Sequence, residues 1–309
     1  MSATDWNDLR YVLAVARSNS AAAAARALGV SHATVLRRIR AVEQSFSTVF
    51  FERLPSGYVA TEAGRTLVRV AEQVEASVTD TRRLIDGRTA ELSGTVRFTT
   101  TDSLFDSLVL PLLPDFRRKY PTIQVETVVT NNVLDLDKGD ADVTLRPSLH
   151  PPKALVGCRL CRLDFAAYAA SGYLDAQGDK PWIELDWLMP SGSPAQSPAG
   201  NWLLGIIPSQ RAVLSADSFI ALRSAAVAGL GATVLPCFLA RESTQLRQVL
   251  AAPRTASTEL WILTHVNLRQ SGRIRAFMEH IATGIRACRE LLECDGPSSS
   301  IDDDAVQQS

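Results

Sequence analysis

The N-terminal part of the chain has apolar positions three and four residues apart, the spacing of an amphipathic helix. The first such set is Trp6, Leu9, Leu13 and Ala16. It predicts a helix that ends at the polar residues 18–20. Ser20 is placed to cap a second helix over 21–28, which is almost entirely alanine, and Gly29 is placed to end it.

A third helix is predicted to begin at Ser31, because this hydroxyl residue precedes a new helical stripe. The stripe consists of Val35, Ile39, Val42 and Phe46. At about 100° per residue, the opposite face is centred on Ala33, Arg37, Arg40 and Gln44. Arg38 lies nearer the apolar edge, where its stem is expected to pack while its charge reaches water.

Two helices joined by a glycine turn, the second with a small and cationic outer face, are typical of a helix-turn-helix that reads the DNA major groove. Residues 50–53 and 56–61 then predict two short strands about a turn, a wing whose Arg53 is placed to reach a phosphate. A solvated cationic face is the alternative. The predicted DNA-binding residues are Ser31, His32, Ala33, Thr34, Leu36, Arg37, Arg38, Arg40 and Arg53.

A long helix is predicted after the wing, because no helix breaker occurs between Gly64 and Gly87. Its apolar positions alternate four and three residues apart, which forms a heptad stripe suited to pairing with a second copy of the chain. The stripe consists of Leu67, Ala71, Val74, Val78, Thr81 and Ile85. The alternative is a long helix that packs on its own domain.

The pattern changes after residue 93. β-rich runs at 95–101, 123–129 and 141–146 alternate with helical spacing over 103–120. The same alternation continues through 217–231, 232–236, 259–266 and a helix from about 271. Strands that alternate with helices predict an α/β domain with a mostly parallel sheet.

Charge and composition support a basic module attached to a second part. The 309 residues are 46% hydrophobic and 21% charged, as in a folded chain of two or three domains. The net charge is −1, but residues 1–65 carry eight arginines and five acidic residues, a local charge of +3. Neither a secretory signal nor an apolar run of membrane-spanning length is found, so we expect a cytoplasmic protein without a membrane partner.

Five cysteines, at 158, 161, 237, 288 and 294, are an odd number and are scattered, which favours reduced thiols over a disulfide framework. Cys158 and Cys161 form a single CxxC, with no second pair and no nearby histidine, and we interpret them as structural. The sequence has no nucleophile elbow, P-loop, dinucleotide fingerprint or HExxH motif. We therefore predict no enzyme activity, no metal site and no cofactor.

Residues 1–64 resemble the winged helix-turn-helix of LysR-type transcriptional regulators, through "AAAAARALGVSHATVLRRIRAVEQ", "FFER" and "TEAG" in that order. The family commonly has Gln-Pro where this chain has His32-Ala33, and Ser where it has Leu36. Residues 94–290 resemble the family's effector domain, through "LPLLPDFRRKYPTIQVE", "GDADVTLR" and "AAVAGLGATVLPCFLARE". The resemblance implies a periplasmic-binding-protein-like fold of two lobes, joined by crossovers near 158–165 and 263–267, with a small-molecule effector between them. It also implies binding to double-stranded DNA, dimers that form a tetramer and, for an activator, contact with RNA polymerase.

The expected organisation follows from these patterns and the resemblance. Residues 1–64 form the DNA-binding domain, 65–92 the dimerisation helix and 93–294 the effector-binding domain. Lobe I takes 93–162 and 266–294, lobe II takes 163–265, and 295–309 form a disordered tail. Residues 178–208, rich in Pro, Ser and Gly, are expected to be a surface loop anchored by Trp182, Trp187 and Trp202, and the alternative is a lid that contacts the ligand.

Candidate effector residues follow the predicted strands, because open α/β sheets bind ligands at strand ends. They are Thr100, Thr101, Ser103, Asn131, Asn132 and Arg146. With Thr99, the hydroxyl residues form a suitable cradle for a carboxylate, although Asp102 and Asp106 argue against an anion in the same place. Arg146 is placed to pair with an acidic ligand or to bridge Asp142. The alternatives for control are a redox response through Cys158 or Cys237, and a ligand-independent DNA-binding repressor.

Overall fold

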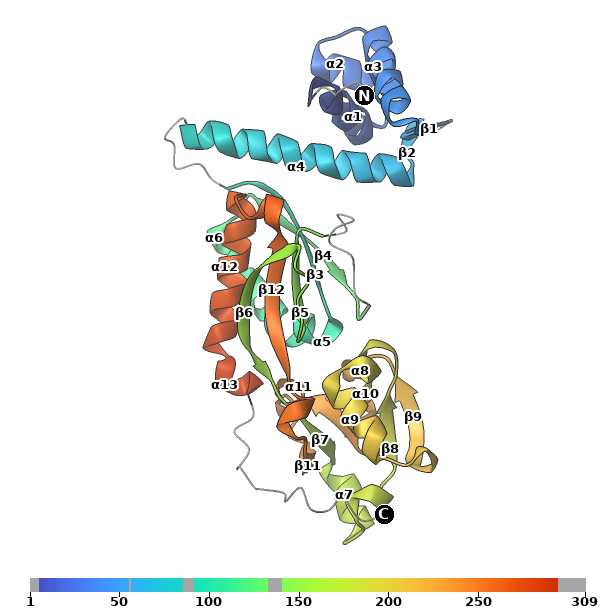
Figure 1. Ribbon diagram of the computed structural model, residues 1–309, viewed down its shortest axis with the longest axis vertical. Helices are drawn as coiled ribbons and strands as arrows, with labels where there is room; N and C mark the ends of the chain where they lie inside the picture. Colours follow the sequence, from blue (N-terminus) through green and yellow to red (C-terminus); the bar gives the residue numbers. More distant parts are fainter. Residues whose placement is uncertain (1–5, 56, 86–91, 133–140, 294–309) are drawn as a thin grey trace. The chain divides into compact units, whose positions relative to one another are not determined.

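The computed structural model describes residues 6–55, 57–85, 92–132 and 141–293. The chain forms two compact units, one running to Gly94 and one beginning at Thr95 (Figure 1). The first contains α1 (Trp6–Ser18), α2 (Ala21–Leu28), α3 (His32–Phe46), β1 (Phe51–Leu54), β2 (Gly57–Ala60) and α4 (Glu62–Ile85). These elements confirm the predicted order of three helices, a two-stranded wing and a long helix, although the long helix already begins inside the range assigned to the DNA-binding domain.

Local capping signals explain the helix bounds in the first unit. The Ser20 hydroxyl accepts a hydrogen bond from the amide of Ala23 at 3.3 Å, and the Ser31 hydroxyl accepts one from Thr34 at 3.1 Å. Gly29 ends α2 in the left-handed conformation with φ 66°. Both predicted caps and the predicted glycine turn are therefore confirmed.

The core of this unit joins α1, α2 and α3. Val35, Ile39 and Val42 are buried as predicted, against the buried alanines of α2. On α1, Leu13 of the predicted apolar set is buried. Val12 and Val15 are also buried, although they were not part of that set. The prediction for Phe46 is wrong, because its side chain is 48% exposed. It is the last residue of α3, and its ring meets the ring of Phe50 edge-on, with centroids 5.6 Å apart.

The cap at Ser31 gives a testable contribution to the order of α3. Changing Ser31 to alanine removes the acceptor for the Thr34 amide, which costs roughly 1 kcal/mol. We expect amide hydrogen exchange in the first turn of α3 to become roughly five-fold faster, measured by mass spectrometry on the full chain. Ser45→Ala is the control, because that hydroxyl bonds the Val42 carbonyl near the other end of the helix. Equal exchange in the two variants would contradict the capping role.

The second unit is built on two sheets. The first has the order β4-β3-β5-β12-β6. Its strands are β3 (Gly94–Thr100), β4 (Ile123–Val129), β5 (Val143–Pro147), β6 (Leu155–Leu163) and β12 (Thr258–His265). Strands β3 and β5 are parallel, but β12 runs antiparallel to both β5 and β6. The sheet is therefore mixed, and the expectation of a mostly parallel sheet was wrong.

Helices cover this sheet. The stretch after β3 comprises α5 (Asp102–Leu104), the π-helical turn η1 (Phe105–Val109), the 3-10 turn η2 (Leu110–Leu112) and α6 (Leu113–Lys119). The C-terminal helices are α12 (Gly272–Ala287) and α13 (Arg289–Leu292), joined to β12 through η7 (Val266–Leu268). The Phe277 ring of α12 lies edge-on to Phe98 of β3 and Phe116 of α6, with centroids 5.1 and 5.3 Å apart. All three are fully buried, so they form the centre of the first lobe.

The second sheet has the order β10-β7-β11, and a parallel pair β8-β9 joins it through a bridge between Trp187 and Ala232. These strands are β7 (Phe165–Ala170), β8 (Trp187–Pro190), β9 (Ala212–Ala216), β10 (Thr233–Pro236) and β11 (Leu246–Ala251). The helices of this lobe are α7 (Ser171–Gln177), α8 (Gly192–Gln196), α9 (Pro198–Ile206), α10 (Phe219–Val227) and α11 (Cys237–Arg241). Short 3-10 turns are η4 (Trp182–Glu184), η5 (Ser209–Arg211) and η6 (Arg254–Ala256).

The chain crosses between the lobes twice. It leaves the first sheet at Asp164, between β6 and β7, where the first crossover was predicted. It returns between β11 and β12, within residues 252–257. The second predicted crossover, 263–267, is therefore too late, and residues 258–265 belong to the first lobe. The reason is that β12 pairs with β5 and β6, partners that no local pattern identifies.

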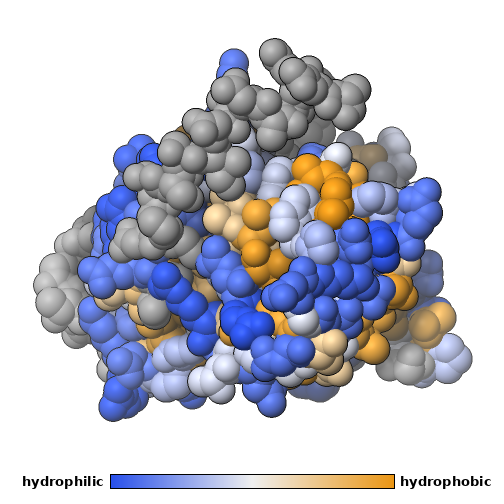
Figure 2. Space-filling view, turned by 90° about the horizontal axis from the view of Figure 1, so that it is seen from below, coloured by the Kyte–Doolittle hydropathy of each residue, from blue (hydrophilic) through white to orange (hydrophobic). Residues whose placement is uncertain are grey.

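The stretch 178–208 was also predicted wrongly. It contains η4, β8, α8 and α9, and Trp187 is fully buried. Its proline and serine residues serve as helix starts, because Ser197 caps α9 and Pro198 occupies the first helical position. The face seen in Figure 2 carries both hydrophilic and apolar areas, as is usual for folded proteins. No helix in the part of the chain that the structure describes is long and apolar enough to cross a membrane.

Candidate functional site

The outer face of α3 carries the side chains predicted for it. His32, Ala33, Arg37 and Arg40 are all exposed, because the buried stripe of α3 faces the core on the other side. The first turn is narrow, and its hydroxyls are ordered by a 2.8 Å hydrogen bond between Ser31 and Thr34. A slim N-terminus followed by two exposed guanidinium groups is the surface that a recognition helix needs in the major groove.

Two of the predicted DNA-binding residues, Arg38 and Leu36, make contacts within their own unit. Arg38 donates to the Asp8 carboxylate at 3.0 Å and lies over the Tyr11 ring, so it ties α3 to α1. This matches its predicted place at the apolar edge. Leu36 packs, partly buried, against the core of the unit. Neither side chain stands on the outer face with Arg37 and Arg40.

The wing is positioned by contacts with α1 and α3. Strands β1 and β2 are antiparallel, with Arg53 opposite Tyr58, and Arg53 is exposed. A Cβ on Gly57 would lie 2.3 Å from the Asn19 carbonyl oxygen, so only glycine allows this approach to the end of α1. The Glu43 carboxylate of α3 accepts hydrogen bonds from the amides of Phe50, at 2.9 Å, and Phe51, at 3.3 Å. The recognition helix and the wing are therefore held together.

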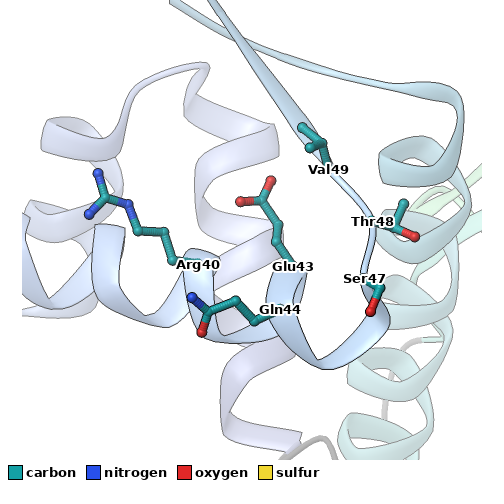
Figure 3. Close-up of a pocket in the computed structure, with 6 residues that line it drawn as sticks. All are labelled: Arg40, Glu43, Gln44, Ser47, Thr48 and Val49. Atoms are coloured by element: carbon teal, nitrogen blue, oxygen red, sulfur yellow. The ribbon is translucent and has the colours of Figure 1, made fainter.

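A hollow lies between the C-terminal half of α3 and the segment that leads to the wing (Figure 3). Glu43 points across it toward Val49, while Arg40 and Gln44 project from α3 (Figure 3). Ser47 and Thr48 add hydroxyls on the far side. Arg40 and Gln44 therefore belong both to the outer face of α3 and to the lining of the hollow.

The heptad stripe of α4 divides into two parts. Ala71 is fully buried, and Leu67 packs partly buried against the core of its own unit. The Arg17 guanidinium of α1 also holds α4 through Glu75, at 2.6 Å. Val74 is partly buried and Val78 is 38% exposed. The side chains of Thr81 and Ile85 lie outside the described residues. The first part of the stripe therefore packs within its own unit, as the alternative held, and Val78 remains open to a partner.

Arg146 is the charged group among the predicted effector residues. Its guanidinium donates to the Thr130 carbonyl at 2.8 Å and to the Thr99 hydroxyl at 3.3 Å, and its Nε is buried without an acceptor among the described residues. Burial lowers the pKa of Arg146. No acidic partner is found for Arg146 among the residues that the structure describes. The Asp142 carboxylate instead accepts from the Arg97 amide, so the bridge considered as an alternative is not formed.

The predicted hydroxyl cradle is only partly available. Thr100 is fully buried and donates to the Leu145 carbonyl at 2.9 Å, so its hydroxyl is used inside the sheet. Thr101 caps α5 by accepting from the Leu104 amide at 3.4 Å, and Ser103 is buried. Asn132 is exposed, and its backbone amide donates to the Thr130 hydroxyl.

Asp102 and Ser218 join the two lobes at this position. Sequence reasoning named Asp102 only as an argument against an anion, and it missed Ser218. The Ser218 hydroxyl donates to the Asp102 carboxylate at 2.5 Å. The Asn131 amide donates to Asp102 at 3.0 Å and to the Asp217 carbonyl at 3.1 Å. Ser218 also caps α10, a role that its place before the predicted helix could have indicated. Asp102 and Asn131 come from the first lobe and Ser218 from the second.

Among the described cysteines, Cys237 differs from the expectation of reduced thiols, because it is disulfide-bonded. Cys158, Cys161 and Cys288 are free. Burial raises the pKa of Cys161 to about 12, so this thiol stays protonated at neutral pH, which argues against a reactive role. No group of three or more metal-binding side chains is found among the described residues.

The thiol assignments predict selective alkylation. Cys161 is 3% exposed and protonated, whereas Cys158 is partly exposed. With iodoacetamide and the folded protein at about pH 8, we expect Cys158 to react on the order of ten-fold faster than Cys161, measured by peptide mass spectrometry. In denaturant the two rates should become similar. Comparable rates in the folded protein would contradict the burial of Cys161.

Comparisons with known proteins agree with this geometry. Residues 6–65 match the model of the bacterial regulatory helix-turn-helix proteins of the lysR family, and residues 89–286 match the LysR substrate binding domain. A transcriptional regulator of Xanthomonas campestris is 29% identical over 175 residues, 57% of this chain and 51% of that protein. PtxR, a regulator of Pseudomonas aeruginosa, is 27% identical over 89% of this chain and 91% of its own. The solved structure of a full-length OxyR variant from Pseudomonas aeruginosa superposes with a TM-score of 0.64, at 19% identity, over 94% of this chain and all of that one.

Proposed function

Because the chain belongs to the LysR family of bacterial transcriptional regulators, we propose that α3 reads its DNA through Arg37 and Arg40, with Arg53 of the wing on a phosphate. The single observation that carries the proposal is the exposed guanidinium pair on the outer face of a helix whose other face is buried. His32, Ala33 and Thr34 lie at the narrow end that approaches base edges. As a DNA-binding regulator, the protein would act in the cytoplasm.

Salt dependence tests the role of Arg53. A phosphate contact releases counterions, so its loss reduces the slope of log affinity against log salt by about one. We expect Arg53→Ala to lower this slope while leaving the preferred sequence unchanged, measured by fluorescence anisotropy with an operator fragment. An unchanged slope would show that Arg53 does not contact a phosphate.

We further propose that the protein pairs through α4 and that two dimers form a tetramer. Val78 supports this, because it is an exposed apolar residue on the predicted stripe. A two-fold dimer presents two recognition helices to a two-fold symmetric site. Val78→Asp is expected to shift the sedimentation of the full chain toward smaller species, and Val59→Asp, at an exposed wing position, serves as the control. Identical sedimentation of wild type and Val78→Asp would contradict pairing at this stripe.

LysR regulators bind small-molecule effectors, and we propose that this chain holds its effector at Arg146 and Asn131, with a carboxylate on Arg146. The support is the buried Nε without an acceptor, together with the absence of an acidic partner among the described residues. Arg146→Gln is expected to abolish the response of operator binding to a carboxylate effector but not operator binding itself. Arg117→Gln, at an exposed position of α6, is the control. If the protein activates, it would also contact RNA polymerase, which run-off transcription with the purified enzyme tests.

A further inference from the structure

Arg146 and Asp102 present opposite charges in one neighbourhood without pairing with each other. Thr130 and Asn131 are consecutive residues after β4: the Thr130 carbonyl accepts from Arg146, and the Asn131 amide donates to Asp102. Every hydrogen-bond partner found for Arg146 is a neutral oxygen. The two charged groups therefore lie beside the same short segment, and neither has a counter-ion among the residues that the structure describes.

Asp102, which is negatively charged, likewise has only neutral hydrogen-bond partners among the described residues. Its carboxylate accepts from the Ser218 hydroxyl, the Asn131 amide and the Ser103 backbone amide, all neutral donors. A hydrogen bond to a carboxylate is already stronger than one between two neutral groups, and an ammonium donor adds a Coulomb attraction to the carboxylate that a hydroxyl lacks. An ammonium group that replaces the Ser218 contact would therefore gain more from Asp102 than the hydroxyl does.

A ligand with one charge fits this neighbourhood poorly. A simple carboxylate on Arg146 would bring a second negative charge close to Asp102, and a simple amine on Asp102 would bring a positive charge close to Arg146. Like charges at short range disfavour each other, most of all where burial weakens solvent screening. A ligand that carries both groups satisfies both residues and remains neutral as a whole.

We propose that the effector is a small zwitterion of the α-amino-acid class, with its carboxylate on Arg146 and its ammonium group on Asp102. This inference rests on the proposed effector site and adds Asp102 as the residue that selects for the amine. Ser218 reaches Asp102 from the second lobe, so the ammonium group takes the place of an interlobe hydrogen bond. Binding of the amine is thereby linked to the contact between the lobes.

The test is a calorimetric and thermal-shift comparison on the full chain. The twenty L-amino acids are screened first, and each amino acid that binds is compared with its 2-hydroxy acid and its decarboxylated amine. We expect at least one amino acid to bind, and its hydroxy acid to bind on the order of ten-fold more weakly. Asp102→Asn is expected to reduce the ratio of amino-acid affinity to hydroxy-acid affinity to near one while keeping carboxylate binding. Arg146→Gln is expected to abolish binding of both ligands. Asp106→Asn is the matched acid-to-amide control at an exposed position.

The outcomes separate this inference from the proposed site. If hydroxy acids bind as well as amino acids and binding requires Arg146, the carboxylate site stands and the zwitterion inference is overturned. If Asp102→Asn and Arg146→Gln both still prefer an amino acid over its hydroxy acid by the wild-type ratio, the site itself is wrong. If none of the twenty amino acids binds, the zwitterion inference is overturned as well.

Discussion

Replacing both Arg37 and Arg40 with alanine is expected to abolish specific operator binding under physiological salt. The two side chains are exposed about one turn apart on the outer face of α3. A good arginine contact with a guanine contributes about 1–3 kcal/mol, and a phosphate contact adds a salt-dependent share. Losing both should weaken binding by roughly 30-fold or more, measured by anisotropy with an operator fragment.

The fold should tolerate this change, because neither guanidinium is found in a hydrogen bond or ion pair with another described residue. Arg118→Ala removes a positive charge at an exposed position of α6 and should bind like the wild type. Arg38→Ala is informative in a different way, because its ion pair with Asp8 joins α3 to α1 and its loss should lower stability as well as affinity. Wild-type affinity in the Arg37, Arg40 double variant would exclude this face from the interface.

The second large effect is expected from Trp187→Ala in the second lobe. The indole is fully buried, and its Nε1 donates to the Trp182 carbonyl at 3.1 Å. Truncating a buried tryptophan leaves a cavity and removes this hydrogen bond, which together cost about 3–5 kcal/mol. We expect the urea midpoint of the effector-binding unit, followed by circular dichroism, to fall by roughly 1–3 M.

Trp202→Ala is the matched control, because this tryptophan of α9 is partly exposed. Its truncation removes a similar volume but less buried contact area, so the midpoint should fall clearly less. DNA binding by the first unit should persist in both variants at low urea. Equal shifts of the midpoint would show that Trp187 is not a core residue.

The sequence alone was sufficient where the signal is local. Ser20, Gly29 and Ser31 act on residues within one turn, so their roles as caps and turn could be predicted. The stripe of Val35, Ile39 and Val42 also places Arg37 on the opposite face by helix geometry alone. The exposed outer face of α3 could therefore be predicted from helix periodicity, whereas the contacts of Arg38 and Leu36 within their own unit could not.

The sequence was insufficient where distant segments meet. Asp102 and Ser218 are 116 residues apart and touch only because the two lobes come together. Thr100 looked like a ligand residue, but its hydroxyl is used by the neighbouring strand. Strand β12 was assigned to the wrong lobe because its partners, β5 and β6, lie far from it along the chain. Pairing of this kind has no periodic signature in one sequence.

We infer that the protein regulates transcription by binding specific DNA through α3. It is tested most directly by selecting genomic fragments with the purified full chain at about physiological salt, in parallel with Arg37→Ala. We expect the wild type to enrich a discrete set of fragments that share a two-fold symmetric element, and the variant not to do so. Enrichment of no element by the wild type, or of the same element equally by both proteins, would contradict it.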